Sequence, residues 1–246
     1  MNISIGALDI LQIKNGKSRL KGAAMFKDKY QLKRDESIFL AKKTLVENIY
    51  SQAKMENINI TFPDTKTIID GMSVSGLKTD DVQKVLNLRN AWHYVLEDVS
   101  ASLDLDYIKT IHAMVAYGEL PQAMLNTLRN GDVSIGGSFY QPKVPDEAMA
   151  SERIEKILNS SNSATEKALD YFLFACRSQL FWDGNKRTAS IVANKIMIEA
   201  GVGVLIVEEK YLRRFNKLMI DFYETADKSK IKPFLYNNCI VGINYH

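Results

Sequence analysis

The chain has 246 residues, enough for one large domain or two small ones with a substantial hydrophobic core. Hydrophobic residues make up 46% and charged residues 25%, proportions that are ordinary for a soluble globular protein. No run of about 18 apolar residues occurs, so no membrane span is indicated. The first residues lack the basic and apolar regions of a secretory signal, and we therefore expect a cytoplasmic protein.

The net charge of +3 is unevenly distributed along the chain. Residues 1–43 contain ten Lys or Arg and four Asp or Glu, a net charge of +6, which leaves −3 for the remainder. Such a basic segment can contact nucleic acid or an acidic partner, but a solvated N-terminal segment is the simpler interpretation. No motif that reads bases accompanies it, so we do not expect nucleic acid to be the partner.

Cysteine and histidine are rare in this sequence. Cys176 and Cys239 lie in apolar, helix-like surroundings, which is typical of buried free thiols in a reducing cytoplasm, although a disulfide between them stays open at this point. The three histidines, His93, His112 and His246, form no cluster with the cysteines. The sequence therefore argues against a structural zinc site.

The hydrophobic pattern predicts an almost entirely helical chain. Residues 1–34 have weak periodicity, so we expect irregular or short-strand structure there. Residues 58–77 contain a proline and two glycines, so we expect them to be looped or only partly helical. Thr79 followed by two Asp residues marks one helix start, and the capping box of Ser163 and Glu166 marks another. Helices are predicted over residues 36–57, 79–98, 105–117, 146–158, 164–179, 187–200, 209–226 and 228–241.

The helix predicted over residues 164–179 differs from the others because it is apolar nearly all round. Such a helix has no face suited to water, so we expect it to be the central buried helix of the domain. A short β-run is predicted over residues 204–207, between two of the later helices.

Residues 130–145 break the helical pattern. Val133 and Ile135 alternate with polar residues, and Gly136-Gly137 permits a tight reversal. This pattern predicts a small β-hairpin over residues 133–140.

The sequence Asp183-Gly184-Asn185-Lys186-Arg187 connects two predicted helices. A helix N-terminus presents unpaired N–H groups and a partial positive charge, and glycine allows a ligand to approach the backbone closely. The two basic side chains add donors suited to phosphate oxygens. One carboxylate beside phosphates is a usual way to hold Mg²⁺. The pattern favours a nucleotide-phosphate site with Asp183 on the metal, while a plain connection between two helices is the alternative.

The stretch FWDGNKR, residues 181–187, resembles the core of the Fic domain, whose motif reads H-P-F-x-[DE]-G-N-[GK]-R. The helices on either side, the segment GVGVLIVEE and the upstream SIGGSFY also look like the Fic arrangement, so the resemblance covers roughly residues 75–241. It implies an all-α fold: a helical bundle around a central buried helix, with a small β-hairpin flap and an N-terminal extension. We expect a basic, helical extension over residues 1–75 and a Fic-like core domain over residues 76–246.

The resemblance also implies an activity. Fic proteins typically transfer AMP from ATP to a Ser, Thr or Tyr hydroxyl of a target protein, and a relative of the toxin type, which also has Lys in the motif, transfers a phosphoryl group. ATP and Mg²⁺ are therefore the expected cofactors, and the flap over residues 133–140 would pair with an extended segment of the target protein. The implied roles are a core anchor for Phe181, the metal for Asp183, the anion hole for Gly184, Asn185 and Lys186, and a phosphate clamp for Arg187.

Gln179 stands where the family has its catalytic histidine. That histidine accepts the proton of the attacking hydroxyl, whereas an amide has no basic site in the working pH range. Loss of a positioned general base typically costs about 10²–10⁴ in rate. A glutamine can still orient a nucleophile or a water, as one does in some GTPases. We expect an impaired or altered activity rather than none.

Other departures concern regulation. Leu180 replaces the usual proline of the motif, and Ser190 stands where many members have a second Arg. In those members that Arg is blocked by a glutamate from the motif [ST]-x-x-x-E-[GN]. Glu56-Asn57 resembles the end of this motif, but Gln52 sits where Ser or Thr is expected, with Ser51 one residue early. Whether Glu56 is inhibitory or only an exposed acid at a helix end stays open.

The sequence is compatible with two functions. One is a divergent Fic transferase, and the other is a non-catalytic module that binds a nucleotide or a protein segment through the same fold. Nucleic-acid binding through the basic arm is a minor third alternative. Neither His93 nor His112 is expected to replace the base, because His112 falls among apolar residues of its predicted helix and reads as a packing histidine.

Overall fold

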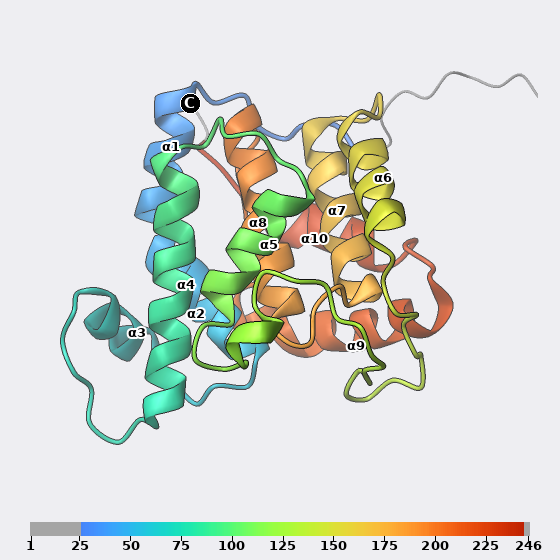
Figure 1. Ribbon diagram of the computed structural model, residues 1–246. Helices are drawn as coiled ribbons and strands as arrows, with labels where there is room; N and C mark the ends of the chain where they lie inside the picture. The colour runs from blue at the N-terminus through green and yellow to red at the C-terminus, as the bar shows by residue number, and fades with distance from the viewer. Residues whose placement is uncertain (1–25, 244–246) are drawn as a thin grey trace, which may run out of the picture.

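The computed structural model describes residues 26–243, and within them the chain is helical with one two-stranded sheet. This confirms the expected all-α class (Figure 1). The sheet pairs β1, Val204–Leu205, with β2, Ile240–Val241, in antiparallel register. The α-helices are α1 Arg34–Lys43, α2 Leu45–Met55, α3 Phe62–Ile69, α4 Thr79–Glu97, α5 Leu105–Val115, α6 Glu147–Leu158, α7 Ala164–Ser178, α8 Asn185–Ala200, α9 Glu209–Thr225 and α10 Ile231–Asn238.

Helix α8 lies at the centre of the bundle. It packs against α7, α5, α4 and α1, and every residue from Arg187 to Ile198 is buried. Helix α7, which the sequence predicted as the central helix, is its main neighbour but leaves Asp170 and Phe174 partly exposed. The prediction therefore identified one of the two central helices, and α8 is the more enclosed of them. In Figure 1, α8 runs vertically behind α5, with α7 and α6 to its right.

Side-chain caps define several helix starts. Ser163 Oγ accepts a hydrogen bond from the backbone N–H of Glu166 at 3.0 Å, as the predicted capping box requires. The Glu166 carboxylate does not reach back to Ser163, because it is paired with Lys232 Nζ at 2.8 Å on α10. Asp104 and Asp146 cap α5 and α6 in the same way as Ser163 caps α7.

Two predicted helices differ in the structure, and residues 58–77 are partly helical as expected. The helix expected over residues 36–57 is broken at Thr44, whose hydroxyl donates to the Leu40 carbonyl at 2.9 Å. Residues 58–77 contain the short helix α3, which Thr61 caps. The helix expected over residues 228–241 ends at Asn238, because the next residues form β2.

The β-hairpin predicted over residues 133–140 is not formed. The segment contains a turn, with the Ser138 N–H donating to the Ile135 carbonyl at 3.0 Å, but it has no paired strands. The hydroxyl of Ser138 and the N–H of Phe139 bond to the Glu224 carboxylate on α9 instead. The loop is therefore held by a helix side chain rather than by a partner strand.

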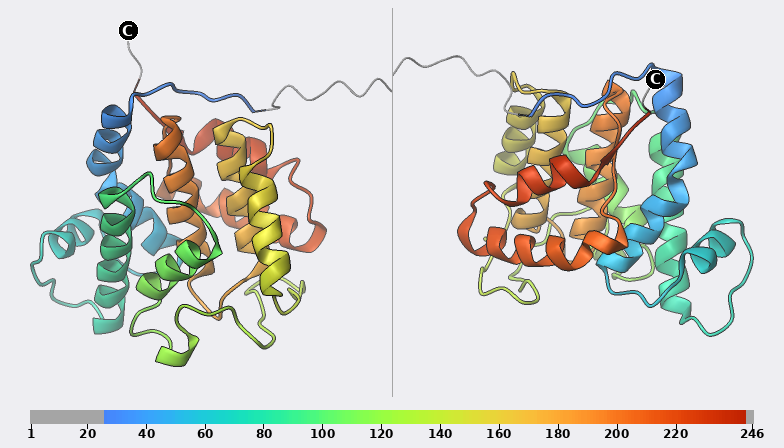
Figure 2. Two further views of the ribbon diagram at one scale, coloured as in Figure 1. Left: turned by 45° about the horizontal axis from the view of Figure 1, so that its top comes forward. Right: turned by 180° about the vertical axis from the view of Figure 1, so that it is seen from behind.

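The helices before residue 75 join the same core as the rest. Helix α1 packs on α8, and α2 contacts α4, α8 and α9. Figure 2, seen from behind, shows α2 beside α9. The boundary between residues 75 and 76 stays a prediction, and residues 1–25 of the basic segment over residues 1–43 lie outside the described residues. None of the helices described here combines the length and the apolar character needed to cross a membrane.

Candidate active site

The turn between α7 and α8 depends on two residues in left-handed backbone conformation. Gln179, which ends α7, has φ 46°, and Gly184, which precedes α8, has φ 72°. A Cβ at Gly184 would lie 3.2 Å from Val115 Cγ1, so this position favours glycine for its conformation and for the close approach of α5. The turn therefore packs closely against the C-terminal end of α5.

Asn185 holds this turn together from inside. Its Oδ1 accepts from the Phe181 N–H at 3.0 Å, and its Nδ2 donates to the Phe181 carbonyl at 2.8 Å. The same Nδ2 donates to Gln179 Oε1 at 3.0 Å, and Gln179 Nε2 donates to the Cys176 carbonyl at 2.7 Å. The oxygen and the nitrogen of the Gln179 amide therefore each form a hydrogen bond within the protein, and both polar atoms of the Asn185 side chain stabilise the turn.

Phe181 and His112 form the floor of the turn. The two rings stack at 3.8 Å between centroids with an angle of 5° between their planes, and both side chains are buried. His112 Nε2 lies 3.1 Å from the Asp183 carbonyl oxygen, and Nδ1 has no hydrogen-bond partner. Burial lowers the pKa of His112 to about 4. His112 is thus a neutral donor that packs under the turn, in agreement with its reading as a packing histidine.

Asp183 is the accessible acid of the turn, with 58% of its side chain exposed. Its Oδ1 accepts from the Gly184 N–H at 2.6 Å and lies 3.8 Å from Arg187 Nη2. No side chain caps α8, so the N–H groups of its first turn, which lie beside this carboxylate, are available to donate hydrogen bonds to a ligand. No group of three or more His, Cys, Asp or Glu is placed to hold a metal anywhere in residues 26–243. A lone carboxylate fits Mg²⁺, which takes few protein ligands when nucleotide phosphates supply others.

Arg187 lies beneath the turn rather than on its surface, with 1% of its side chain exposed. Nη1 and Nη2 donate to the two carboxylate oxygens of Glu119, the second at 3.0 Å, and Nη1 also reaches the Val115 carbonyl at 3.3 Å. Burial alone would lower the pKa of Arg187, but the hydrogen bonds that it donates to Glu119 raise it overall. Nε is buried without a partner. No local pattern connects Glu119 to this turn, because Glu119 lies 68 positions before Arg187.

Lys186 is held by the C-terminal end of α2. Its Nζ donates to the Met55 carbonyl at 3.0 Å and lies 3.7 Å from Glu56 Oε1. One turn earlier on α2, Gln52 Nε2 donates to Ser190 Oγ at 3.1 Å on α8. The segment that resembles the inhibitory motif is therefore in contact with the turn, although through Lys186 and Ser190 rather than through a second Arg.

Arg129 is a further member of the site that the sequence reading missed. It is 1% exposed, and its guanidinium donates to four backbone carbonyls, those of Gln179, Gly131, Pro142 and Lys143. Burial lowers its pKa. Arg129 joins the loop before α6 to Gln179 at the end of α7. An isolated Arg before a Gly-containing loop carries no pattern that would have revealed this role.

His93 and Phe139 make no hydrogen bond with residues 179–187 of the turn. His93 is exposed on α4. Phe139, in the loop predicted as a flap, has 98% of its surface exposed. Cys176 and Cys239 are buried and free, as expected.

The sequence of this chain is similar to those of known proteins. Residues 102–197 match the Fic/DOC family. The protein adenylyltransferase Fic of Drosophila yakuba and that of Drosophila melanogaster are each 25% identical over 201 residues, which cover 79% of this chain and 39% and 40% of those proteins. The chain therefore spans about 40% of the length of these relatives.

Solved structures share the fold. Fic-1 from Caenorhabditis elegans aligns with a TM-score of 0.66 and 20% identity, covering 82% of this chain and 64% of that one. A Fic domain containing signaling protein from Bacteroides thetaiotaomicron aligns with a TM-score of 0.66 and 14% identity, covering 84% and 81%. The turn at residues 179–187 lies within the matched segment. Residues 102–197 are therefore similar to the Fic/DOC family, and the fold is the one that these solved Fic structures share.

Proposed function

We propose that this chain transfers AMP from Mg·ATP to a hydroxyl of a target protein, at a reduced rate. The observation that carries the proposal is the turn before α8, where the exposed carboxylate of Asp183 adjoins uncapped N–H groups and two basic residues. The relatives named protein adenylyltransferase support the choice of reaction.

In this proposal the chain's own residues bind and orient the nucleotide. The N–H groups at the start of α8 and the Lys186 side chain contact phosphate oxygens. Asp183 holds Mg²⁺, which neutralises charge on the phosphates when it is bound. The hydroxyl oxygen of the target attacks the α-phosphorus, the bond to the β-phosphate bridging oxygen breaks, and pyrophosphate leaves. The proton of the hydroxyl must pass to an acceptor.

Gln179 does not provide that acceptor. An amide is not basic near neutral pH, and its oxygen already accepts from Asn185 Nδ2 at 3.0 Å. The proton would pass to water, and a missing general base typically lowers the rate by about 10²–10⁴. Restoring histidine at this position should recover part of that factor.

The basic residues of the turn are neutralised before any nucleotide arrives. Glu119 occupies both terminal nitrogens of Arg187, and Glu56 lies beside Lys186. Phosphates must replace the Glu56 contact to reach Lys186, whereas Arg187 acts on the site from below through its buried charge. We propose that Glu56 lowers nucleotide affinity through Lys186.

The same proposal includes a protein partner and a location. The exposed Phe139 in the loop over residues 133–140 is the side chain best placed to contact a target segment, since the loop backbone on its inner side is tied to Glu224. Free buried cysteines fit a cytoplasmic location.

A non-catalytic module is the second candidate. The observation that favours it is that the Gln179 amide, which is not basic, donates to the Cys176 carbonyl and accepts from Asn185 within the turn. Without a base at this position, the fold would bind a nucleotide or a protein segment without turnover.

One labelling experiment separates the two candidates. Wild type, Gln179→His and Gln179→His/Asp183→Ala are incubated with Mg²⁺ and ATP labelled at the α or the γ phosphate, alone and in cell lysate. Incorporation of α label by wild type, increased in Gln179→His and lost with Asp183→Ala, supports AMP transfer. Label from the γ position would indicate phosphoryl transfer instead. Incorporation by Gln179→His alone would support the non-catalytic module, and no label in any variant would refute the nucleotide site.

A further inference from the structure

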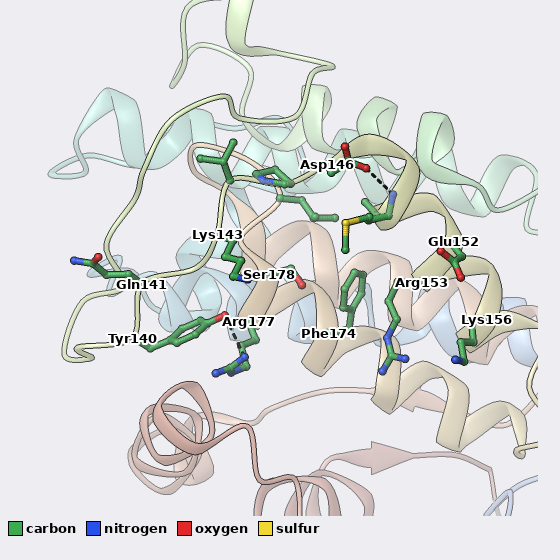
Figure 3. Close-up of a pocket in the computed structure, with 15 residues that line it drawn as sticks. Tyr140, Gln141, Lys143, Asp146, Glu152, Arg153, Lys156, Phe174, Arg177 and Ser178 are labelled. Atoms are coloured by element: carbon green, nitrogen blue, oxygen red, sulfur yellow. Dashed lines mark hydrogen bonds between the residues drawn. The ribbon is translucent and has the colours of Figure 1, made fainter.

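A groove of about 690 Å³ lies on α6 and α7, bounded by the loop over residues 140–146 (Figure 3). None of the residues from Asp183 to Arg187 lines it, so it is separate from the nucleotide site proposed above. Its walls are largely apolar and include Val144, Met149, Phe174 and Leu180. Cavities of roughly 300–1,000 Å³ with apolar walls and a few polar groups are typical of sites for small organic ligands.

The rim of this groove is positively charged. Lys143, Arg153 and Lys156 line it, and none of them forms an ion pair or a side-chain hydrogen bond with the described residues. Met149, Arg153 and Lys156 are spaced four and three residues apart on α6, which places an apolar contact and two cations on one helix face. The helix therefore offers an apolar contact for the hydrophobic body of a ligand and two cations for its charged head.

The other charged residues of the groove reduce this excess only in part. Arg177 stacks over the Tyr140 ring at 3.7 Å and donates to the Tyr140 hydroxyl at 3.1 Å, so it belongs to the wall. Asp146 is occupied in capping α6 through the Met149 N–H at 2.9 Å. Glu152 is the remaining acid. The unpaired cations outnumber it.

The groove also adjoins the residue that replaces the catalytic histidine. Ser178 and Leu180, on either side of Gln179, are part of its lining. The Arg129 guanidinium bonds to the Pro142 and Lys143 carbonyls in one wall and to the Gln179 carbonyl in the turn. The Arg129 side chain therefore connects the wall of the groove to the turn through hydrogen bonds.

We propose that this groove binds a small amphipathic organic anion, with an aliphatic or aromatic body between Met149 and Phe174 and a carboxylate or phosphate head at Arg153 and Lys156. Apolar walls bind the body by removing it from water, and unpaired cations beside them select the sign of the head. The assignment rests on the shape and charge of the groove and does not depend on transferase activity.

The test uses two probes with the same chain and opposite charge. Laurate and dodecyltrimethylammonium are titrated into the full chain by calorimetry, both below their micelle concentrations. Laurate should bind with one-to-one stoichiometry and at least about ten times more tightly than the cation. Butyrate, which has the same head but a short body, should bind at least about ten times more weakly than laurate.

Matched variants locate the site. Arg153→Glu/Lys156→Glu reverses two exposed charges at the groove and should weaken laurate binding at least about tenfold. Lys42→Glu/Lys43→Glu makes the same change of net charge on α1, where both lysines are exposed, and should leave the affinity unchanged. Circular dichroism checks that both variants fold. Equal binding of the two probes, retained laurate affinity in the α6 variant, or equal loss in the α1 variant would overturn the proposal.

Discussion

His112 should make this protein lose stability as the pH falls from neutrality toward 5. The ring is buried against Phe181, and burial lowers its pKa to about 4 from the ordinary value of 6.5. The unfolded chain therefore takes up a proton at a higher pH than the folded chain, and protonation favours unfolding. The contribution is complete above pH 6.5, declines as the pH falls, and is exhausted near pH 4.

The size of the effect follows from the two pKa values. A difference of 6.5 − 4 = 2.5 units corresponds to about 3 kcal/mol over the whole range, at roughly 1.4 kcal/mol per unit. Between pH 7 and pH 5 the expected loss is about 2 kcal/mol. This interval lies mostly above the range in which the carboxylates titrate, so His112 should dominate it.

Urea unfolding at pH 7 and pH 5 measures this loss. His112→Phe keeps a flat ring against Phe181 but removes the titrating group, so its free energy of unfolding should change about 2 kcal/mol less than that of wild type between the two pH values. His93→Asn removes an exposed histidine from α4 and should behave as wild type does. If His112→Phe loses as much stability as wild type between pH 7 and pH 5, the assignment of a buried neutral histidine is wrong.

Three further substitutions test the contacts around the turn. Glu56→Gln removes the carboxylate 3.7 Å from Lys186 and should tighten Mg·ATP binding several-fold in calorimetry, whereas unchanged or weaker binding would contradict the proposed competition. Glu119→Gln leaves the buried Arg187 without its counter-charge and should destabilise the fold by about 3–5 kcal/mol in urea unfolding; a loss below about 1 kcal/mol would show that the pair is not buried in solution. Gly184→Ala forces a Cβ into a left-handed conformation and should cost about 1–2 kcal/mol in thermal unfolding, and a variant as stable as wild type would refute the strained turn.

Local signals in the sequence were sufficient for most helices and for the location of the turn. Ser163 caps α7 through the Glu166 N–H, and the two acids after Thr79 lie in the first turn of α4, so both helix starts were predicted correctly from residues close together in the sequence. The hairpin over residues 133–140 was wrong, because alternation of apolar and polar residues requires a partner strand. The segment is bonded to Glu224, 85 positions away from Phe139, and no local pattern announces such a contact.

The charges of the turn were visible in the sequence, but their partners were not. Arg187 was expected to clamp phosphate because its motif position and its type suit that role. The structure places it beneath the surface, where Glu119, in the turn after α5, accepts hydrogen bonds from both of its terminal nitrogens. The pairing joins residues that are distant in sequence, and burial of a side chain at the start of a helix depends on what packs against that helix.

In the proposed function, position 179 and the paired charges act on different steps, and experiment can separate them. Glu56, 3.7 Å from Lys186, would compete with phosphate for that lysine, so its removal should change the affinity for Mg·ATP without supplying a base. Histidine at position 179 supplies a base but leaves the Glu56 contact in place. The two changes should therefore combine approximately additively in free energy, one in nucleotide binding and the other in the rate of transfer at saturating nucleotide. A Gln179→His variant that also binds Mg·ATP more tightly would show that Asn185, which bonds to Gln179 within the turn, couples the two steps.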